Sequence, residues 1–305
     1  SAAEAGRPIQ IGGFGTTGSA GELYRDIITT RSSRTSDYRS TEILAHYAWA
    51  AAQVPDVGTV VDIGGNDSKV ICVTEHGLTF AMNEKCAAGT GAFVEAIARR
   101  FGVPIERFAE VALTSTNPAR LAARCAVFGE SHIVHKSRAG VPVPDLFMGL
   151  AFSLVRIYLA DVGKGKEIRT PIVLQGGTCL NAAVQRAFRE VLGLTDGGLV
   201  VYPDPRMIIC AGALGAALLA KAMYERGHDS AFKGYEAVLG RDYQAVPTPC
   251  AHAACPRRCG DLIALLEDGA VIGGYKSIDC DYGMFEGLIE REPVRAQMQR
   301  AVSAA

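Results

Sequence analysis

The sequence lacks an excess of charge of either sign: 31 Lys and Arg stand against 32 Asp and Glu, and the net charge is −1. Such a chain has no basic footprint for nucleic acid or for an acidic membrane surface. It also lacks an uninterrupted apolar run of about 18 residues, the length of a membrane-spanning helix. Residues 1–8 show no basic stretch followed by an apolar core, so no signal peptide is indicated. These absences predict a cytoplasmic protein with neither a nucleic-acid nor a membrane partner.

Two further patterns are missing. No internal repeat of solenoid length occurs, and Ser131 lacks the glycine elbow of a serine hydrolase. The 305 residues are enough for one large or two medium domains with a proper core. With 49% hydrophobic and 21% charged residues, the composition is that of an ordinary globular protein.

Cysteine, in contrast, is abundant. The chain has nine cysteines, an odd number without the spacing of a secreted disulfide scaffold. Metal or redox use is therefore the better inference. Cys72 lies in a predicted strand and Cys210 at the start of a predicted helix, so both are expected to be core thiols, and Cys179 is expected to pack.

Two apolar runs, at 57–63 and 171–174, predict buried strands. A glycine pair follows each run, at 64–65 and at 176–177. Loops of this kind let backbone amides face an anion such as a phosphate. A tight turn between a strand and the next element is the alternative interpretation.

Charged residues accompany the first glycine pair. Asp62 or Asp67 could hold a hydrated magnesium ion. Lys69 could pair with a phosphate, or it could stabilise a carboxylate at the end of the strand. The sequence leaves both roles of this lysine open.

A cysteine precedes each of two predicted helices. Cys86 stands before a Gly-rich turn and a helix at 91–101, and Cys125 before a helix at 127–137. The positive end of the helix dipole favours an anion there, either a thiolate or a phosphate. An ordinary buried cysteine at a helix start is the alternative for Cys86.

Five segments carry a resemblance to a known family. They read DIGGNDSK at 62–69, MNEKCAAGTG at 82–91, CAVF at 125–128, QGGTCLN at 175–181 and GALGAA at 212–217. In this order they resemble the activator family of 2-hydroxyacyl-CoA dehydratases, which also contains the ATP-binding subunits of benzoyl-CoA reductase. The resemblance covers about residues 10–224.

The resemblance implies an α/β chain with the actin/hexokinase-type ATPase fold, in which helices flank mixed sheets. It implies bound ATP and Mg²⁺, with Asp62 and Asp67 on the magnesium side as the catalytic pair. The residues expected to bind the nucleotide lie in the glycine loops and at two helix starts. They are Gly64, Gly65, Asn66, Lys69, Gly89, Thr90, Gly91, Gly176, Gly177, Asn181, Ala211 and Gly212.

The resemblance also implies a homodimer, or a pseudo-symmetric heterodimer, that holds one 4Fe-4S cluster between its subunits. The family's two cluster cysteines correspond to Cys86 and Cys125. Because a cubane cluster needs four thiolates, two chains must share it. The expected activity is an ATPase that donates low-potential electrons to an acyl-CoA dehydratase or reductase. The alternative is a nucleotide-binding actin-fold module, or a small-molecule kinase-like domain, with structural cysteines.

The family pattern and the sequence differ at both ends. The family opens with an Asp-x-Gly-Ser/Thr phosphate loop, and no match precedes Ile9, so we expect the chain to start inside the first ATPase subdomain. We expect an ATPase-like domain at 1–225, a linker at 226–248 and a small Cys-rich extension at 249–305. The extension has four possible ligands of a zinc ion or of a second iron–sulfur site: Cys250, Cys255, Cys259 and Cys280.

Overall fold

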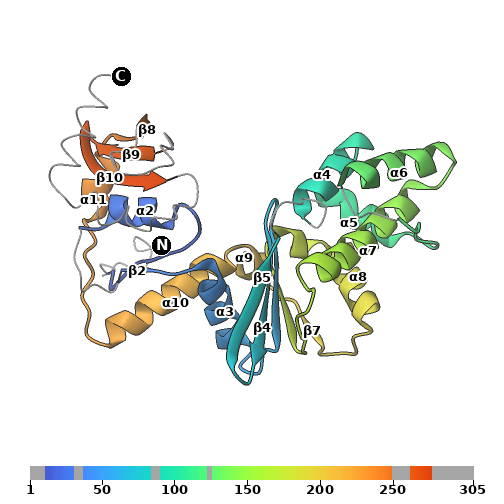
Figure 1. Cartoon of the computed structure of the whole chain (residues 1–305), viewed down its shortest axis with the longest axis horizontal. Helices are drawn as coiled ribbons and strands as arrows, with labels where there is room; N and C mark the ends of the chain where they lie inside the picture. The colour runs from blue at the N-terminus through green and yellow to red at the C-terminus, as the bar shows by residue number, and fades with distance from the viewer. Residues whose placement is uncertain (1–10, 31–36, 84–89, 122–125, 249–261, 277–305) are drawn as a thin grey trace, which may run out of the picture. The chain divides into compact units, whose positions relative to one another are not determined.

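The computed structural model describes residues 11–30, 37–83, 90–121, 126–248 and 262–276 (Figure 1). Its contacts divide the chain into two compact units. The sheet unit is Thr41–Leu218, and the terminal unit combines Ser1–Ser40 with Leu219–Ala305. The chain passes between them twice, once before the first helix of the sheet unit and once within helix α10 (Ala211–Glu225).

The sheet unit is built on five strands in the order β5-β4-β3-β6-β7. Strands β5, β4 and β3 are antiparallel neighbours, whereas β3, β6 and β7 run parallel. All five residues of β3 are buried, as expected for a central strand with neighbours on both edges. The bounds are β3 (Thr59–Ile63), β4 (Ser68–Thr74), β5 (Gly77–Met82), β6 (Ile172–Gln175) and β7 (Leu199–Val200).

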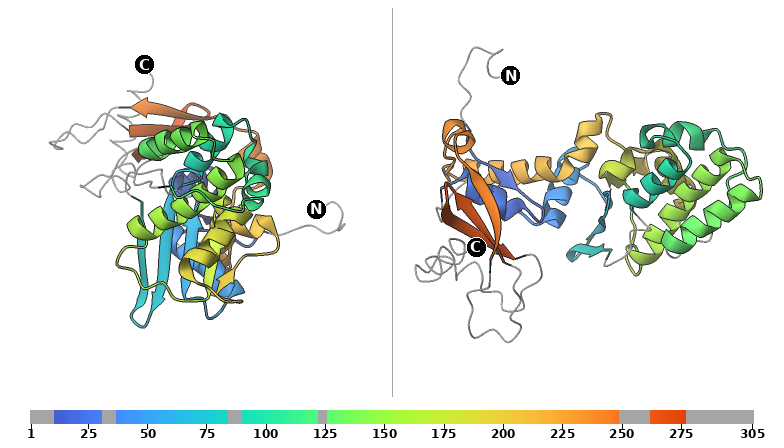
Figure 2. Two further views of the ribbon diagram at one scale, coloured as in Figure 1. Left: turned by 90° about the vertical axis from the view of Figure 1, so that its right-hand side faces the viewer. Right: turned by 90° about the horizontal axis from the view of Figure 1, so that it is seen from above.

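Helices cover both faces of this sheet. Helix α3 lies on one side, and α7 and α8 lie on the other (Figures 1 and 2). Two of these helices start at side-chain caps: Thr41 accepts a hydrogen bond from Leu44 N at 3.3 Å, and Asn181 accepts one from Ala183 N at 3.0 Å. The helices are α3 (Glu42–Gln53), α4 (Gly91–Arg100), α5 (Ile105–Leu113), α6 (Ala126–Arg138), α7 (Val143–Asp161), the 3-10 turn η2 (Gly177–Leu180), α8 (Ala182–Leu192) and α9 (Pro205–Ile209).

Helix α7 forms the centre of the core. Among the described residues it is the one helix long and apolar enough to cross a membrane, and 67% of its most apolar window is buried inside the protein. Phe147 of α7 stacks on Phe108 of α5 with ring centroids 4.5 Å apart, and Tyr158 meets Phe188 of α8 edge-on at 5.8 Å. The apolarity of α7 is therefore that of a core helix.

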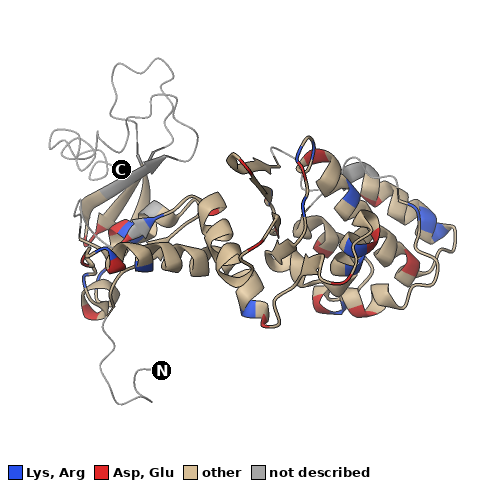
Figure 3. Cartoon of the chain, turned by 90° about the horizontal axis from the view of Figure 1, so that it is seen from below, with Lys and Arg blue, Asp and Glu red and all other residues tan. Residues whose placement is uncertain are grey.

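Charges on the surface of the sheet unit are mixed in sign. Figure 3 shows Lys and Arg interspersed with Asp and Glu along its helices. Several pairs lie one helical turn apart, such as Arg99 with Glu95 at 2.6 Å and Arg186 with Glu190 at 2.6 Å. In this view the described residues form no field of one sign, in keeping with the near-zero net charge.

In the terminal unit, segments far apart in sequence come together. The carboxylate of Asp37 accepts hydrogen bonds from Phe14 N (2.9 Å), Ser230 Oγ (2.9 Å) and Ala231 N (2.6 Å). The stretch 226–248, for which the sequence predicts a linker, contains α11 and β8, and β8 pairs with β9. The elements are β1 (Gly15–Thr16), α2 (Gly21–Ile28), β2 (Tyr38–Arg39), α11 (Tyr235–Leu239), β8 (Tyr243–Thr248), β9 (Leu262–Glu267) and β10 (Ala270–Lys276).

Candidate functional site

Three polar residues form one line across the centre of the sheet. Asp62 of β3 is the register partner of both Lys69 in β4 and Gln175 in β6. Directly paired residues of neighbouring strands point to the same face, so the three side chains lie together. They meet helix α3, which presents Glu42 and His46 one turn apart.

Lys69 is the cation of this line. Its Nζ lies 3.2 Å from Asp62 Oδ2 and 3.2 Å from Glu42 Oε2, and only 4% of the residue is exposed. Burial by itself lowers the pKa of the lysine, but the two carboxylates outweigh it, and the pKa is raised above 10.5. Lys69 therefore stabilises a carboxylate near the end of β3, which is one of the two roles that the sequence left open.

The first glycine pair forms a tight turn between β3 and β4. Gly64 N donates to Asp67 O at 2.8 Å, and the side chain of Asn83 donates to Asn66 O at 3.0 Å. The carbonyl oxygens of this turn accept hydrogen bonds from the start of α4, where Gly91 N reaches Gly64 O at 2.9 Å. The turn thus satisfies helix amides that would otherwise have no partner.

The second glycine pair is shaped by close contact. Gly176 has φ +84°, a conformation that side chains disfavour, and an added Cβ would lie 2.5 Å from Ile63 O and 2.6 Å from Asp62 Oδ1. Thr178 then reaches across to the first turn, since its Oγ1 donates to Gly64 O at 2.9 Å. The two glycine loops are therefore in direct contact.

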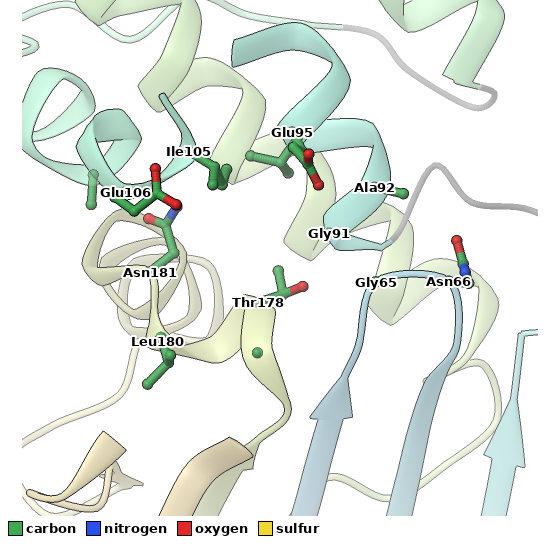
Figure 4. Close-up of a pocket in the computed structure, with 13 residues that line it drawn as sticks. Gly65, Asn66, Gly91, Ala92, Glu95, Ile105, Glu106, Thr178, Leu180 and Asn181 are labelled. Atoms are coloured by element: carbon green, nitrogen blue, oxygen red, sulfur yellow. The ribbon is translucent and has the colours of Figure 1, made fainter. Parts of the chain in front are cut away.

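A pocket of about 580 Å³ opens beside these loops (Figure 4), within the size range of small-molecule sites. The turn after β3, the start of α4, helix α5 and the segment around η2 each contribute to its wall. In Figure 4 the side chains of Glu106 and Asn181 point toward one another. The lining residues are Gly65, Asn66, Gly91, Ala92, Val94, Glu95, Ile105, Glu106, Ala109, Gly177, Thr178, Leu180 and Asn181.

Both loops leave open space toward a ligand at their second glycine. A Cβ added at Gly65 or at Gly177 would meet nothing within 4 Å. A phosphate-sized group could therefore approach the backbone at both positions. Gly64 and Gly176 instead face protein atoms, so the two members of each pair have different roles.

The structure brings together part of the predicted set. Five of the predicted residues line the pocket: Gly65, Asn66, Gly91, Gly177 and Asn181. The others among the described residues are absent from the lining: Asp62, Gly64, Asp67, Lys69, Thr90, Gly176, Ala211 and Gly212. Gly89 falls outside the described residues.

Several lining residues are not indicated by the sequence pattern. Glu95, Glu106, Thr178 and Leu180 all face the pocket, although only Thr178 adjoins a glycine pair. Glu95 and Glu106 belong to different helices, and nothing in their local pattern separates them from solvated helix positions. His46 was also missed, and a histidine four residues after Glu42 was the signal that could have indicated it.

Of the three described cysteines, two are buried as predicted and one is not. Cys72 and Cys179 are fully buried, as predicted, and burial raises the pKa of both thiols. The prediction that Cys210 is a core thiol is wrong, because this residue is exposed. It is the C-cap residue of α9, and nearby Ile208 and Ala211 are buried instead. Six predicted metal ligands lie outside the described residues: Cys86, Cys125, Cys250, Cys255, Cys259 and Cys280.

Within the described ranges, no group of three or more His, Cys, Asp or Glu side chains is arranged to hold a metal ion.

The mixed five-stranded sheet, with two central strands that end in contacting glycine loops, defines the core of an actin-like ATPase fold, as the sequence predicted. Residues 5–220 match the BadF/BadG/BcrA/BcrD ATPase family, and the chain belongs to this family. This confirms the resemblance carried by the five sequence segments.

Named relatives and one solved structure agree. The chain is 29% identical to the 2-hydroxyisocaproyl-CoA dehydratase activator of Clostridioides difficile, over 68% of this chain and 77% of the relative. It is 36% identical to the (R)-2-hydroxyglutaryl-CoA dehydratase activating ATPase of Acidaminococcus fermentans, over 61% and 69%. The solved activator of the 2-hydroxyisocaproyl-CoA dehydratase from Clostridium difficile with bound ADPNP superposes with a TM-score of 0.61, at 26% identity over 74% of this chain and 80% of that one.

Proposed function

We propose that the sheet unit binds ATP in the pocket between the two glycine loops and helices α4 and α5. The observation that carries this proposal is the convergence of both loops and the start of α4 on one cavity. The solved relative that carries ADPNP supports the choice of nucleotide. Phosphates would lie against the open backbone at Gly65 and Gly177, where nothing obstructs them.

The rest of the pocket suits a nucleoside. Ile105 and Leu180 are both 36% exposed and supply apolar surface, and Ala109 adds to it. Glu95 and Glu106 supply carboxylates that could accept hydrogen bonds from ligand hydroxyl or amino groups. An apolar wall with a few acceptors is the usual make-up of a small-molecule site.

Magnesium would accompany the phosphates. Oxygen donors and retained waters suit this ion, and the exposed carboxylate of Asp67 on the first turn fits it. Asp62 is buried and paired with Lys69, with its Oδ1 facing Gly176, so we assign it the inner position behind the second loop.

Cys86 and Cys125 are the ligands that we propose for a 4Fe-4S cluster shared by two copies of the chain. The donor set fits in kind, since each cysteine precedes a helix, at Gly91 and at Ala126, and two chains supply the four thiolates of a cubane. Cys72 and Cys179 are fully buried and therefore unsuited to a shared site. When bound, such a cluster supplies a single low-potential electron.

Together these assignments describe a cytoplasmic, ATP-driven electron donor that acts on an acyl-CoA dehydratase or reductase. Two relatives named as dehydratase activators support the dehydratase as partner. Nucleotide binding would change the loops at the ends of β3 and β6. Because α4 begins on the carbonyls of the first turn, a shift of that turn would reach the segment that follows Cys86.

Nucleotide binding is tested with magnesium and ADPNP by isothermal titration. Gly177→Val fills open space at the loop and should weaken binding at least about tenfold, or 1.4 kcal/mol. Gln53→Val, at the exposed end of α3, is the control and should bind as the wild type does. Equal affinity of Gly177→Val and wild type would place the nucleotide elsewhere.

The electron-transfer part is tested separately, by iron and sulfide analysis of anaerobically purified protein. We expect four irons per dimer, and their loss in Cys86→Ala and in Cys125→Ala. A protein that binds ADPNP but carries neither iron nor sulfide would be a nucleotide-binding module alone.

A further inference from the structure

His46 on helix α3 contacts both of the strands that lead into the glycine loops. Its Nδ1 lies 2.6 Å from Gln175 Oε1, at the last residue of β6. Its Nε2 lies 3.6 Å from Asp62 Oδ2, one residue before the end of β3. One imidazole thus spans the ends of two neighbouring parallel strands.

The hydrogen bonds fix the orientation of the groups in this contact. Gln175 Nε2 donates to the backbone oxygen of His46 at 3.2 Å, so its Oε1 must face the ring. Oε1 can only accept, and therefore Nδ1 carries a proton and donates. Nε2 attracts the carboxylate of Asp62 when it carries a second proton, in the imidazolium form. Gln175 is fully buried, so this pair of bonds is costly to break.

Helix α3 is itself held in place. Gly215 of α10 packs directly on Ala45 O, leaving no room for a side chain. Trp49 Nε1 donates to Met207 O of α9 at 3.1 Å, and the next residue of α9, Ile208, accepts the amide of Gly176 at 3.0 Å. The imidazole therefore projects from a fixed support.

We propose that His46 is a positioning residue, which sets the spacing of the two glycine loops through Asp62 and Gln175. The inference rests on the proposed nucleotide site, because the loops matter through what they bind. His46 does not line the pocket. His46 would act on a ligand by holding the two loops, before binding, in the arrangement that the ligand needs. Fewer groups then have to be ordered on binding, which lowers its free-energy cost.

Two conservative variants separate the two contacts. The amide of Asn takes the place of Nδ1, so His46→Asn keeps the bond to Gln175 and loses the contact with Asp62. The longer amide of Gln takes the place of Nε2, so His46→Gln does the reverse. His46→Ala loses both, and His76→Ala in the exposed turn before β5 is the matched control.

Amide hydrogen exchange of the ligand-free protein is the first measurement. The reporters are Gly64 N, bonded to Asp67 O, and Gly176 N, bonded to Ile208 O. We expect faster exchange in both loops for His46→Ala, in the first loop alone for His46→Asn, and in the second alone for His46→Gln. A purely structural role would give the same uniform increase in all three variants and would overturn the proposal.

ADPNP affinity with magnesium is the second measurement. His46→Ala should raise Kd about tenfold and each single-contact variant about threefold, with His76→Ala unchanged. Unchanged Kd in all the His46 variants, with wild-type binding intact, overturns the positioning role. If the wild type binds no ADPNP, the proposed function fails, while the exchange pattern still tests the link between the loops.

Discussion

The two glycine loops of the sheet unit look alike in sequence, but different forces hold them. The strand before the first loop is held by charge, since Asp62 pairs with Lys69, and Lys69 also pairs with Glu42. The second loop is held by shape, because Gly176 presses against Ile63 O with a positive φ. One loop therefore depends on a buried ion pair and the other on a missing side chain.

In each glycine pair the two glycines are needed for different reasons. The outer glycines, Gly65 and Gly177, border open space and suit a ligand, while Gly64 and Gly176 serve the fold. We call the Asp62–Lys69 ion pair the charge anchor and the close contact of Gly176 with Ile63 O the shape anchor. The two anchors meet at Asp62, whose Oδ1 also lies close to Gly176. Substitutions can therefore test the charge anchor and the shape anchor separately.

Removing the charge anchor should have the largest effect. Lys69→Met leaves Asp62 buried without its cation, and breaking a buried pair in this way costs about 3–5 kcal/mol of unfolding free energy. The control is Arg186→Met, which breaks the exposed pair with Glu190 and should cost less than about 1 kcal/mol. Urea unfolding measures both. If the two variants lost equal stability, the buried pair would not be an anchor.

Removing the shape anchor should have the next largest effect. Gly176→Ala places a side chain at φ +84° and against Ile63 O, so we expect a loss of about 3 kcal/mol. Gly177→Ala, with nothing within 4 Å, should stay within about 0.5 kcal/mol of the wild type. Similar unfolding curves for these two neighbours would contradict the division of roles within the pair.

The contact between the loops should have a smaller effect. Gly91→Ala at the start of α4 would overlap Thr178 Oγ1, and overpacking of this kind costs about 1–3 kcal/mol. Thr178→Ala loses one hydrogen bond, worth about 1 kcal/mol. In the double variant the overlap is relieved, so the two costs should not add. Additive costs in the double-mutant cycle would show that the two positions are not coupled.

The smallest expected effect is a dependence on pH. The pKa of Lys69 is raised above its ordinary value of 10.5, net of the burial that opposes this. The stabilisation is therefore complete below about pH 10 and is lost as the pH rises through the folded pKa. The gap in unfolding free energy between wild type and Lys69→Met should be constant from about pH 8 to 10 and narrow above that. A gap that widens at alkaline pH would mean that the pKa is lowered instead.

Local pattern was enough to predict most of the sheet unit. The apolar runs at 57–63 and 171–174 correspond to β3 and β6, and the helix expected at 91–101 corresponds to α4. Hydrophobic periodicity and glycine turns are signals that span only a few residues, so they can be recognised in a single sequence. The family and the fold followed from the same segments.

The terminal unit could not be predicted in the same way. The weak pattern at 226–248 hides β8, whose partner β9 begins at Leu262. The same unit joins Asp37 to Ala231, almost two hundred positions away in the chain. Contacts between residues so far apart in the chain depend on the tertiary fold, and no local hydrophobic pattern indicates them.

The sequence by itself determined that two buried strands end in glycine pairs and that Lys69 stands close to Asp62. Only the tertiary structure showed that Lys69 has a second carboxylate partner, because Glu42 approaches it from helix α3. Tertiary structure likewise placed His46 against both strand ends and brought α4 and α5 together to enclose the pocket. The reason is physical: a side chain's partner depends on which surfaces meet in a packed core, whereas its tendency toward helix or strand depends on its neighbours in the chain.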